Sequence, residues 1–574
     1  MTRFANFSLA VALITLIVPT VRADEATGPV LSAVPDDAWA VLAVRNMADL
    51  DKKLGALGQQ LNLPPISPLG MLKGNMGLVA GVNDDASMAM ALMPLPAMIP
   101  DEFTKNLVLF VPTTDVTELV KTMEPEDAGD GLTKVMFAYQ PSYVARKGDF
   151  AVISTNKDLV KRVADSKGRY GAKMSPHQLK RFAEDDVSLI ASMDAAASSD
   201  VFKPFIGMMA QGGMDPATVT DMRSLQVGLR VDSKGVRLGW FSDAKPGSKL
   251  AEVMAAQTAT DKSLLTGLPK EKYALALGLV LSKEASAEAS KMLETALSGV
   301  FARAGPDGEA FAKLLQPAMS MLRHTRSASV CVSALPEGPN GLLGLTKVVT
   351  FEGGVSACMA ELRKMVDTIN DVLASGDREP KMTGLLELRP AAEQVDGQDV
   401  THLLINVDKV PDLDDSAKAS ITSVFGAEGL LFRLAPGGGD RVVVTFGGGP
   451  TRLKEVMALA EEGKSPLDED AGIVKARHSL PKERSMEAFI AVENVVALIK
   501  SIGNATASPP LPITMPEINA PIAVASAPIA KTGSQSEFYL PIETITAIKD
   551  AAMGLFMGGM GGPPGEPPPP PPPS

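Results

Sequence analysis

Apolar and polar positions near the start of the chain follow a strand-then-helix order. Residues Ala38 to Val44 read AWAVLAV, and such an unbroken apolar run predicts a strand covered on both faces. Asn46 and Asp49 follow at the spacing of a helix N-cap and its third helical residue. Apolar residues then recur every three or four positions, which predicts one helical face over 47–61. These residues are Met47, Leu50, Leu54, Leu57 and Leu61.

A second stretch repeats this pattern. It begins at Leu265, 234 residues after Leu31, and LTGLPKEKYALAL aligns there with LSAVPDDAWAVLA without a gap. The alignment matches Pro269 with Pro35 and Tyr273 with Trp39. A cap residue and a helical face follow in both places. We interpret the match as an internal duplication.

The two halves also end in the same predicted order of elements: strand, helix, hairpin, helix. In the first half the strand lies within 187–194, and the hairpin strands are LQVGLRV and VRLGWFS. In the second half the strand lies within 487–494, and the hairpin strands are APIAVASA and SEFYLPI. This order predicts two similar lobes, 24–262 and 263–552.

Between these landmarks, short apolar strands joined by tight turns recur. In 76–166 the pattern predicts a hairpin around Asp84 and Asp85, a strand LVLFVP, and three strands with a tight turn at 147–149. Six further strands in 330–446 alternate with helices. Those helices are expected at 355–374, 413–424 and 451–462. Tight turns favour antiparallel pairing, so the predicted fold class is α+β, with sheets covered by amphipathic helices.

The two ends of the chain have different compositions. Residues 1–23 carry Arg3, an apolar core from Leu9 to Val18 that is too short to span a bilayer, and Ala23 before Asp24. This predicts a signal peptide and a periplasmic or secreted protein, and no later segment predicts a transmembrane helix. Residues 553–574 are rich in Gly, Met and Pro, which predicts a disordered tail. A docking peptide for an aromatic groove is the alternative.

The net charge limits the possible classes of partner, and the number of cysteines limits the possible disulfide bonds. The net charge is −12, and it becomes −14 once the two arginines of 1–23 are removed. This acidic balance argues against nucleic acid and anionic membrane surfaces as partners. Cys331 and Cys358 are the two cysteines, so a disulfide framework is excluded. One bridge and two free thiols both remain open.

The residue types that carry catalysis or bind metals occur without the spacing they need. The four histidines are His177, His324, His402 and His478. None has a zinc-site spacing. The acidic clusters at 412–415 and 468–470 lack the Gly and Glu of a calcium loop.

Two further patterns resemble sites but lack an essential part. Gly447-Gly448-Gly449 precedes a helix but lacks the Lys-Ser/Thr of a phosphate loop. The tetrapeptide 242–245 and the tripeptide 531–533 resemble penicillin-binding motifs, but Pro246 follows Lys245, where that family needs a helix. We therefore predict no catalytic, cofactor-binding or metal-binding residues, no cofactor, and a protein that is not an enzyme.

Three stretches carry a resemblance to a known group: VPDDAWAVLAVRNMADLDKKL, QPSYVARKGDFAVISTNKDLVKRV and FYLPIETITAIKDAAMGLFMGGMGGP. The chain resembles a family of uncharacterised secreted bacterial proteins. The resemblance implies export and family membership, and it implies no activity or site residues.

Two functional hypotheses remain. The first is an exported non-catalytic protein that binds a protein partner or helps to build the cell envelope. The second is a periplasmic carrier of apolar or lipid-like ligands. The second is favoured by methionine-rich strands, such as the one with Met88, Met90 and Met93, because methionine gives a soft, adaptable apolar surface. Core filling is the alternative interpretation of those methionines.

Overall fold

The structure is a computed structural model of the 574-residue chain. It describes residues 28–558 except for 65–66, 79, 98, 212–215, 302–305, 337, 376–382, 412 and 507–514. The predicted signal peptide and residues 559–574 of the predicted tail lie outside the described residues.

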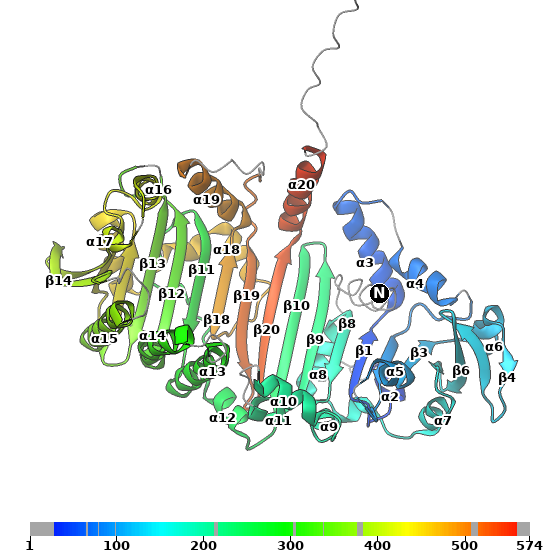
Figure 1. The fold of residues 1–574 in the computed structure, drawn as a ribbon. Helices are drawn as coiled ribbons and strands as arrows, with labels where there is room; N and C mark the ends of the chain where they lie inside the picture. The colour runs from blue at the N-terminus through cyan, green and yellow to red at the C-terminus, as the bar shows by residue number, and fades with distance from the viewer. Residues whose placement is uncertain are drawn as a thin grey trace, which may run out of the picture.

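The described residues form one 20-stranded sheet, and every strand pairing in it is antiparallel (Figure 1). The first ten strands are β1 (Ala40–Val44), β2 (Met88–Leu92), β3 (Leu107–Pro112), β4 (Glu126–Asp127), β5 (Thr133–Phe137), β6 (Gln140–Lys147), β7 (Phe150–Ser154), β8 (Val187–Ala191), β9 (Met222–Asp232) and β10 (Gly235–Ala244). The second ten are β11 (Tyr273–Val280), β12 (Thr325–Ala334), β13 (Leu343–Phe351), β14 (Leu386–Val395), β15 (Gln398–Ile405), β16 (Leu430–Pro436), β17 (Arg441–Phe446), β18 (Met486–Ile490), β19 (Ile522–Ile529) and β20 (Gly533–Pro541). The mixture of antiparallel sheet and helices confirms the predicted α+β class.

Helices connect many of these strands. In the first half they are α2 (Pro29–Ala33), α3 (Met47–Gln60), α4 (Pro68–Met76), α5 (Pro100–Lys105), α6 (Val116–Val120), α7 (Lys157–Asp165), α8 (Pro176–Glu184), α9 (Met193–Ala197), α10 (Lys203–Gln211), α11 (Pro216–Asp221) and α12 (Lys249–Ala256). In the second half they are α13 (Lys283–Phe301), α14 (Pro306–His324), α15 (Gly354–Ser375), α16 (Asp415–Phe425), α17 (Gly449–Glu462), α18 (Ala471–Arg477), α19 (Val492–Ala505) and α20 (Ile542–Gly558).

The order of strands across the sheet is the same in both halves, read outward from the centre. The first half runs β10-β9-β8-β1-β2-β3-β7-β6-β5-β4. The second half runs β20-β19-β18-β11-β12-β13-β17-β16-β15-β14. Each strand of the second half thus has the number of its counterpart plus ten. The halves meet where β10 pairs with β20, from Gly235 opposite Pro541 to Asp243 opposite Gly533.

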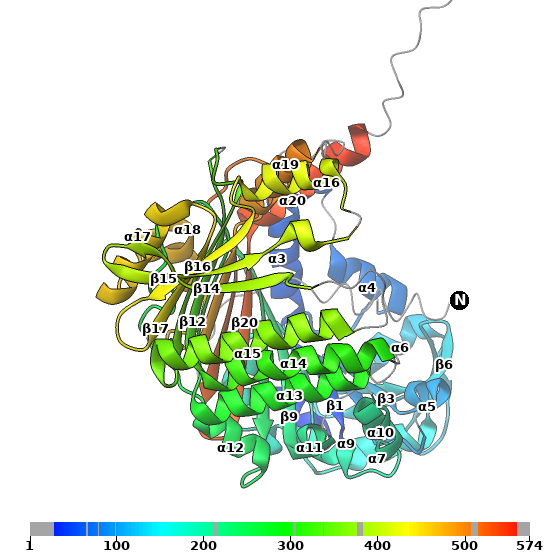
Figure 2. The same ribbon diagram turned by 60° about the vertical axis from the view of Figure 1, so that its left-hand side comes forward.

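The two faces of the sheet differ. Helices α17 and α18 lie behind the sheet in Figure 1, on what we call the backed face. Leu453 and Val456 of α17 pack there against Val348 and Val443. On the opposite face, the open face, helices lie along the two ends of the strands and leave the middle of the strands in view (Figures 1 and 2).

Local signals read from the sequence are confirmed at several helix ends. Asn46 caps α3 by accepting a hydrogen bond from the Asp49 backbone N–H, at 2.8 Å. The Asp49 carboxylate pairs with Lys53 instead of returning to the Asn46 N–H. The predicted helices at 355–374, 413–424 and 451–462 correspond to α15, α16 and α17.

The predicted hairpin around Asp84 and Asp85 is wrong. Strand β2 pairs with β1 and β3, and Val82 forms an isolated bridge with Thr113. Gly77 and Gly81 have φ values of +73° and +71°, so the apolar run before Asp84 ends a helix and turns, and cannot extend as a strand.

Two other predictions need adjustment. Trp39 and Tyr273, matched in the gapless alignment, face opposite sides of the sheet. Trp39 packs with Leu95 and Phe103, whereas Tyr273 packs with Cys331 and Phe489 on the backed face. The register of β11 shifts between Tyr273 and Leu275, which accounts for the change.

Helix α20 continues to Gly558, so the predicted tail is helical from Met553 to that residue.

Candidate functional site

Two rows of side chains cross the middle of the open face from strand to strand. The first row is Met88, Val44, Val187, Leu229, Leu238, Phe538, Val524, Ala488, Leu277, Val330, Lys347, Val444, Leu434 and Thr401. The second row is Met90, Leu42, Leu189, Val227, Trp240, Ser536, Ser526, Met486, Leu279, Ala328, Val349, Val442 and Pro436. We call the two rows together the apolar floor. At about 4.8 Å between strands, it is about 60 Å long.

Much of the apolar floor is open to solvent. Leu189 and Trp240 are 43% and 39% exposed. Leu277, Val330 and many of their neighbours in the rows are partly exposed. Other parts are covered, because α3 packs on Val187 and Leu229. The sheet therefore presents a long apolar surface that helices border on two sides and cover only in part.

A row of helices borders the floor on one side. Helices α9 and α10 both contact α11, and helices α11 to α15 contact one another in chain order along the lower ends of the strands in Figure 1. Lys249 of α12 and Glu288 of α13 form a 3.0 Å ion pair where the two halves meet. On the floor side, Cys358 of α15 packs against Val349 and Val442.

A second group of helices borders the opposite side. Helices α3, α20, α19 and α16 lie along the upper ends of the strands (Figures 1 and 2). Lys549 of α20 donates a 2.7 Å hydrogen bond to the carbonyl oxygen of Leu61, at the end of α3. Ile542 and Ile545 of α20 pack with α3 above the floor. Helices thus border the floor on both sides.

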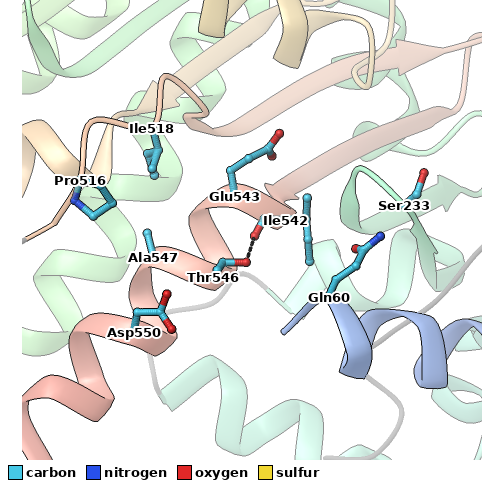
Figure 3. A pocket seen from close by; sticks show the side chains of 9 residues that line it. All are labelled: Gln60, Ser233, Pro516, Ile518, Ile542, Glu543, Thr546, Ala547 and Asp550. Atoms are coloured by element: carbon cyan, nitrogen blue, oxygen red, sulfur yellow. Dashed lines mark hydrogen bonds between the residues drawn. The ribbon is translucent and has the colours of Figure 1, made fainter. Parts of the chain in front are cut away.

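A hollow of about 420 Å³ lies beside α20, where the two halves meet. Figure 3 shows its lining side chains, which come from α20, the end of α3, the β9–β10 turn and 516–518. Ile518, Ile542 and Ala547 give it an apolar character, and Glu543 and Asp550 lie at its edge. A second hollow, of about 640 Å³, lies between α14 and α15 and is lined mainly by polar residues such as Lys313 and Glu361.

Lys347 of β13 is the single charged side chain in the two fully described rows of the floor. Its direct neighbours across the ladder are Val330 and Val444. No carboxylate of the described residues forms an ion pair with its ammonium group. Removal from water lowers the pKa of Lys347, and the nearby Cys358 thiol acts in the opposite direction. Such a cation favours a ligand that brings an anion.

The four histidines remain apart in the structure. His177 of α8 stacks near Phe241, and His324 lies 3.6 Å from Glu352 at the end of α14. His402 of β15 lies 3.0 Å from Glu393, and His478 follows α18. Among the residues that the structure describes, no group of three or more His, Cys, Asp or Glu side chains could hold a metal ion.

The acidic clusters and the glycine run serve the ends of helices. Asp414 accepts from the Ala417 N–H to cap α16, and Asp470 accepts from the Ile473 N–H to cap α18. Asp412 lies outside the described residues. The glycines at 447–449 form the turn from β17 into α17, all with φ between +65° and +74°.

The structure brings the two penicillin-binding-like motifs together at the β10–β20 junction. Asp243 lies opposite Gly533, and its carboxylate accepts a 2.8 Å hydrogen bond from Thr532. Lys245 pairs with Asp194 at 2.7 Å and lies before α12, outside any helix. The pairing of strands explains this proximity.

Sequence reasoning missed the apolar floor and Lys347. The signal present was the alternation within LGLTKVVTF, where Lys347 falls between Leu345 and Val349 on one face of a strand. Its meaning depends on which strands lie beside it, and these come from distant parts of the chain.

No protein-family model and no curated protein sequence matches the chain. Among solved structures, it is similar to crystal forms of a protein named TP0453. For form I the identity is 9%, the match covers 39% of this chain and 81% of that protein, and the TM-score is 0.22. For form III the identity is 10%, the coverage 41% and 89%, and the TM-score 0.22. A likeness this low carries no argument about function.

Among the described residues, no helix combines the length and the apolar character needed to cross a membrane.

Proposed function

We propose that this chain is a non-catalytic binding protein for long, apolar, lipid-like ligands, which lie along the apolar floor. The observation that carries this proposal is the exposed part of the floor, which includes Leu189 and Trp240. Exposed apolar surface costs about 25 cal/mol per Å², and contiguous apolar patches larger than several hundred Å² are rare except at binding surfaces.

The chemistry of the floor favours a lipid-like occupant over a protein partner. Its backbone groups are already paired in the ladder, so a partner strand has no edge to join here. Polar side chains are scarce, with Ser526 and Ser536 near the centre, whereas protein interfaces need a polar rim and several hydrogen bonds. Met90 and Met486 add adaptable apolar surface.

We also propose that the protein acts outside the cytoplasm after removal of residues 1–23, and that an internal duplication produced two similar lobes. The shared order of strands in the two halves supports the duplication. Equivalent connections support it further, since two helices follow both β7 and β17, and one helix follows both β10 and β20.

Tryptophan fluorescence tests the binding function. The chain has two tryptophans, Trp240 on the floor and Trp39, which is buried. We expect dibromostearate methyl ester, a neutral quencher, to reduce the emission of Trp240 in a Trp39→Phe variant. A Trp240→Phe variant, which keeps Trp39, should lose most of the quenching.

A polar substitution on the floor supplies the matched control. Leu189→Gln should weaken binding of the ester by about tenfold, because it places an amide on an exposed part of the floor. Tyr139→Gln changes a residue that is 92% exposed at the β5–β6 turn and should leave binding unchanged. Absence of saturable quenching in the Trp39→Phe variant would overturn the proposed function.

A further inference from the structure

The single charge on the floor indicates the kind of lipid-like molecule that the floor binds. We propose that Lys347 contacts the anionic head group of an amphiphile whose apolar tail lies along the neighbouring strands. This inference rests on the proposed binding function and adds a ligand class to it.

The first argument is the position of Lys347 among apolar neighbours. Val330 and Val444 flank it directly, and Leu345 and Val349 precede and follow it on the same face of β13. An unpaired ammonium group in such surroundings is costly, and a bound anion would offset that cost. Carboxylate and phosphate oxygens form charge-assisted hydrogen bonds with lysine that are about twice as strong as neutral ones.

The second argument comes from the matching position in the first half. Leu109 of β3 lies opposite Met90 and Ile153. Lys347 of β13 lies opposite Val330 and Val444 in the equivalent strands. The same place in the same topology thus accepts a leucine. The fold does not require a charge there, so the lysine is explained better by a ligand than by packing.

The third argument is direction. From Lys347 toward the centre of the molecule, the first row continues through Val330, Leu277, Ala488, Val524 and Phe538, all partly exposed. At about 4.8 Å per strand, these five positions extend about 24 Å. A head group at Lys347 would therefore leave a long acyl tail on apolar surface.

Three probes of equal chain length test the inference: palmitate, hexadecyl phosphate and hexadecanol. We expect the wild-type protein to bind all three. Lys347→Met, which removes the charge at similar length, should weaken binding of both anions by about tenfold or more and change hexadecanol binding by less than about twofold. Lys347→Arg should keep most of the affinity for the anions.

Lys454→Met is the matched control, because Lys454 is 60% exposed on α17 over the backed face. It should leave all three affinities unchanged. If only one anion responds to Lys347→Met, that head group is the one selected and the inference stands. If all three probes bind and Lys347→Met weakens none, the inference is overturned while the binding function survives. If no probe binds the wild type, the proposed function itself is overturned.

Discussion

Several glycines of the sheet make room for buried charged side chains. A Cβ atom at Gly228 would lie 1.7 Å from the Asp185 carboxylate, and one at Gly239 would lie 2.0 Å from the Arg181 guanidinium. Both charged residues are buried, and Arg230 pairs with Asp185 at 2.8 Å. The absence of side chains at these glycines is therefore a condition for the ion cluster on the backed face.

Replacing one of these glycines should destabilise the fold. We expect Gly228→Ala to lower the free energy of unfolding by about 3 kcal/mol, because the methyl group would displace a buried carboxylate from its partners. Denaturant unfolding measures the change. Gly55→Ala in α3 is the control, since nothing lies within 4 Å of the added Cβ, and it should be neutral or stabilise by up to about 1 kcal/mol. Equal stability of the two variants would contradict this account.

Asp186 should make stability depend on pH. Burial raises the pKa of Asp186 from 3.8 to about 6, although Lys53 and Arg45 act to lower it. The folded state therefore binds this proton more tightly than the unfolded state, so stability present below about pH 4 is lost as the pH rises to about 6. The shift corresponds to about 3 kcal/mol.

The measurement is the free energy of unfolding at about pH 3.5 and about pH 7, which lie on either side of this window. Asp186→Asn removes the titrating group and should reduce the loss between the two values, whatever its effect at a single pH. An identical pH dependence in the wild-type and variant proteins would count against the assignment.

The two cysteines illustrate how strand position settles a question that the sequence left open. Cys331 packs with Ala276 and Phe489 on the backed face, and Cys358 packs with Val349 and Val442 on the open face. Both are free thiols, and the sheet separates them. Burial raises the pKa of each, which makes the reactive thiolate scarce.

Thiol titration checks this arrangement. We expect two thiols per chain to react with Ellman's reagent after unfolding and almost none before it. A protein that yields no thiols until a reductant is added would contain a bridge and would contradict the observed packing.

At the scale of elements, Glu487 joins strand β18 to helix α18. Its carboxylate is fully buried and accepts hydrogen bonds from Arg477, at 2.8 and 2.9 Å, and from Arg484, at 2.7 Å. The Leu264 N–H donates a further bond to it at 3.2 Å. Two guanidinium groups from different parts of the chain thus converge on one carboxylate.

Neutralising Glu487 should loosen this junction. We expect Glu487→Gln to cost about 3–5 kcal/mol, because it leaves the buried Arg484 guanidinium without its counter-ion. Glu126→Gln at the exposed Glu126–Lys134 pair is the control and should cost less than about 1 kcal/mol. Thermal or denaturant unfolding compares the two, and similar costs would show that burial at Glu487 has little effect.

Elements were predictable from sequence where their signals are local. Asn46 caps α3, the helix that the apolar periodicity after it also predicts. The predicted partner of β2 was wrong. Strand β2 pairs with β1 and β3, and the turn at Asp84 gives no information about either strand. The candidate site could not be predicted for the same reason, since it exists only after β13 lies between β12 and β17.

At the scale of the molecule, the two halves meet through paired strands, through α20 packed against α3, and through side-chain contacts. Strands β10 and β20 pair over nine residues on each side. Arg181 of the first half reaches Glu537 of the second, at 2.5 Å, and Lys549 reaches the Leu61 carbonyl. These contacts make the junction continuous with the sheet.

This continuity predicts that the halves associate without a covalent link. We expect fragments 24–262 and 263–558, produced together, to co-elute as a one-to-one complex in size-exclusion chromatography. Ser536→Pro in β20 should abolish the complex, because proline removes a ladder donor in a central strand. Folded fragments that elute separately would show that the junction is weaker than its ladder implies.

A sheet of this length also has two ends, and they determine whether molecules join one another. The outermost strands are β4, with two residues, and β14, which contains Pro390 and the charged pair Glu387–Arg389. Short, charged or proline-bearing edges oppose edge-to-edge addition of further chains. The protein can therefore expose a long apolar surface on one face of its sheet, while the two edges of that sheet disfavour growth of a fibre by addition of further copies.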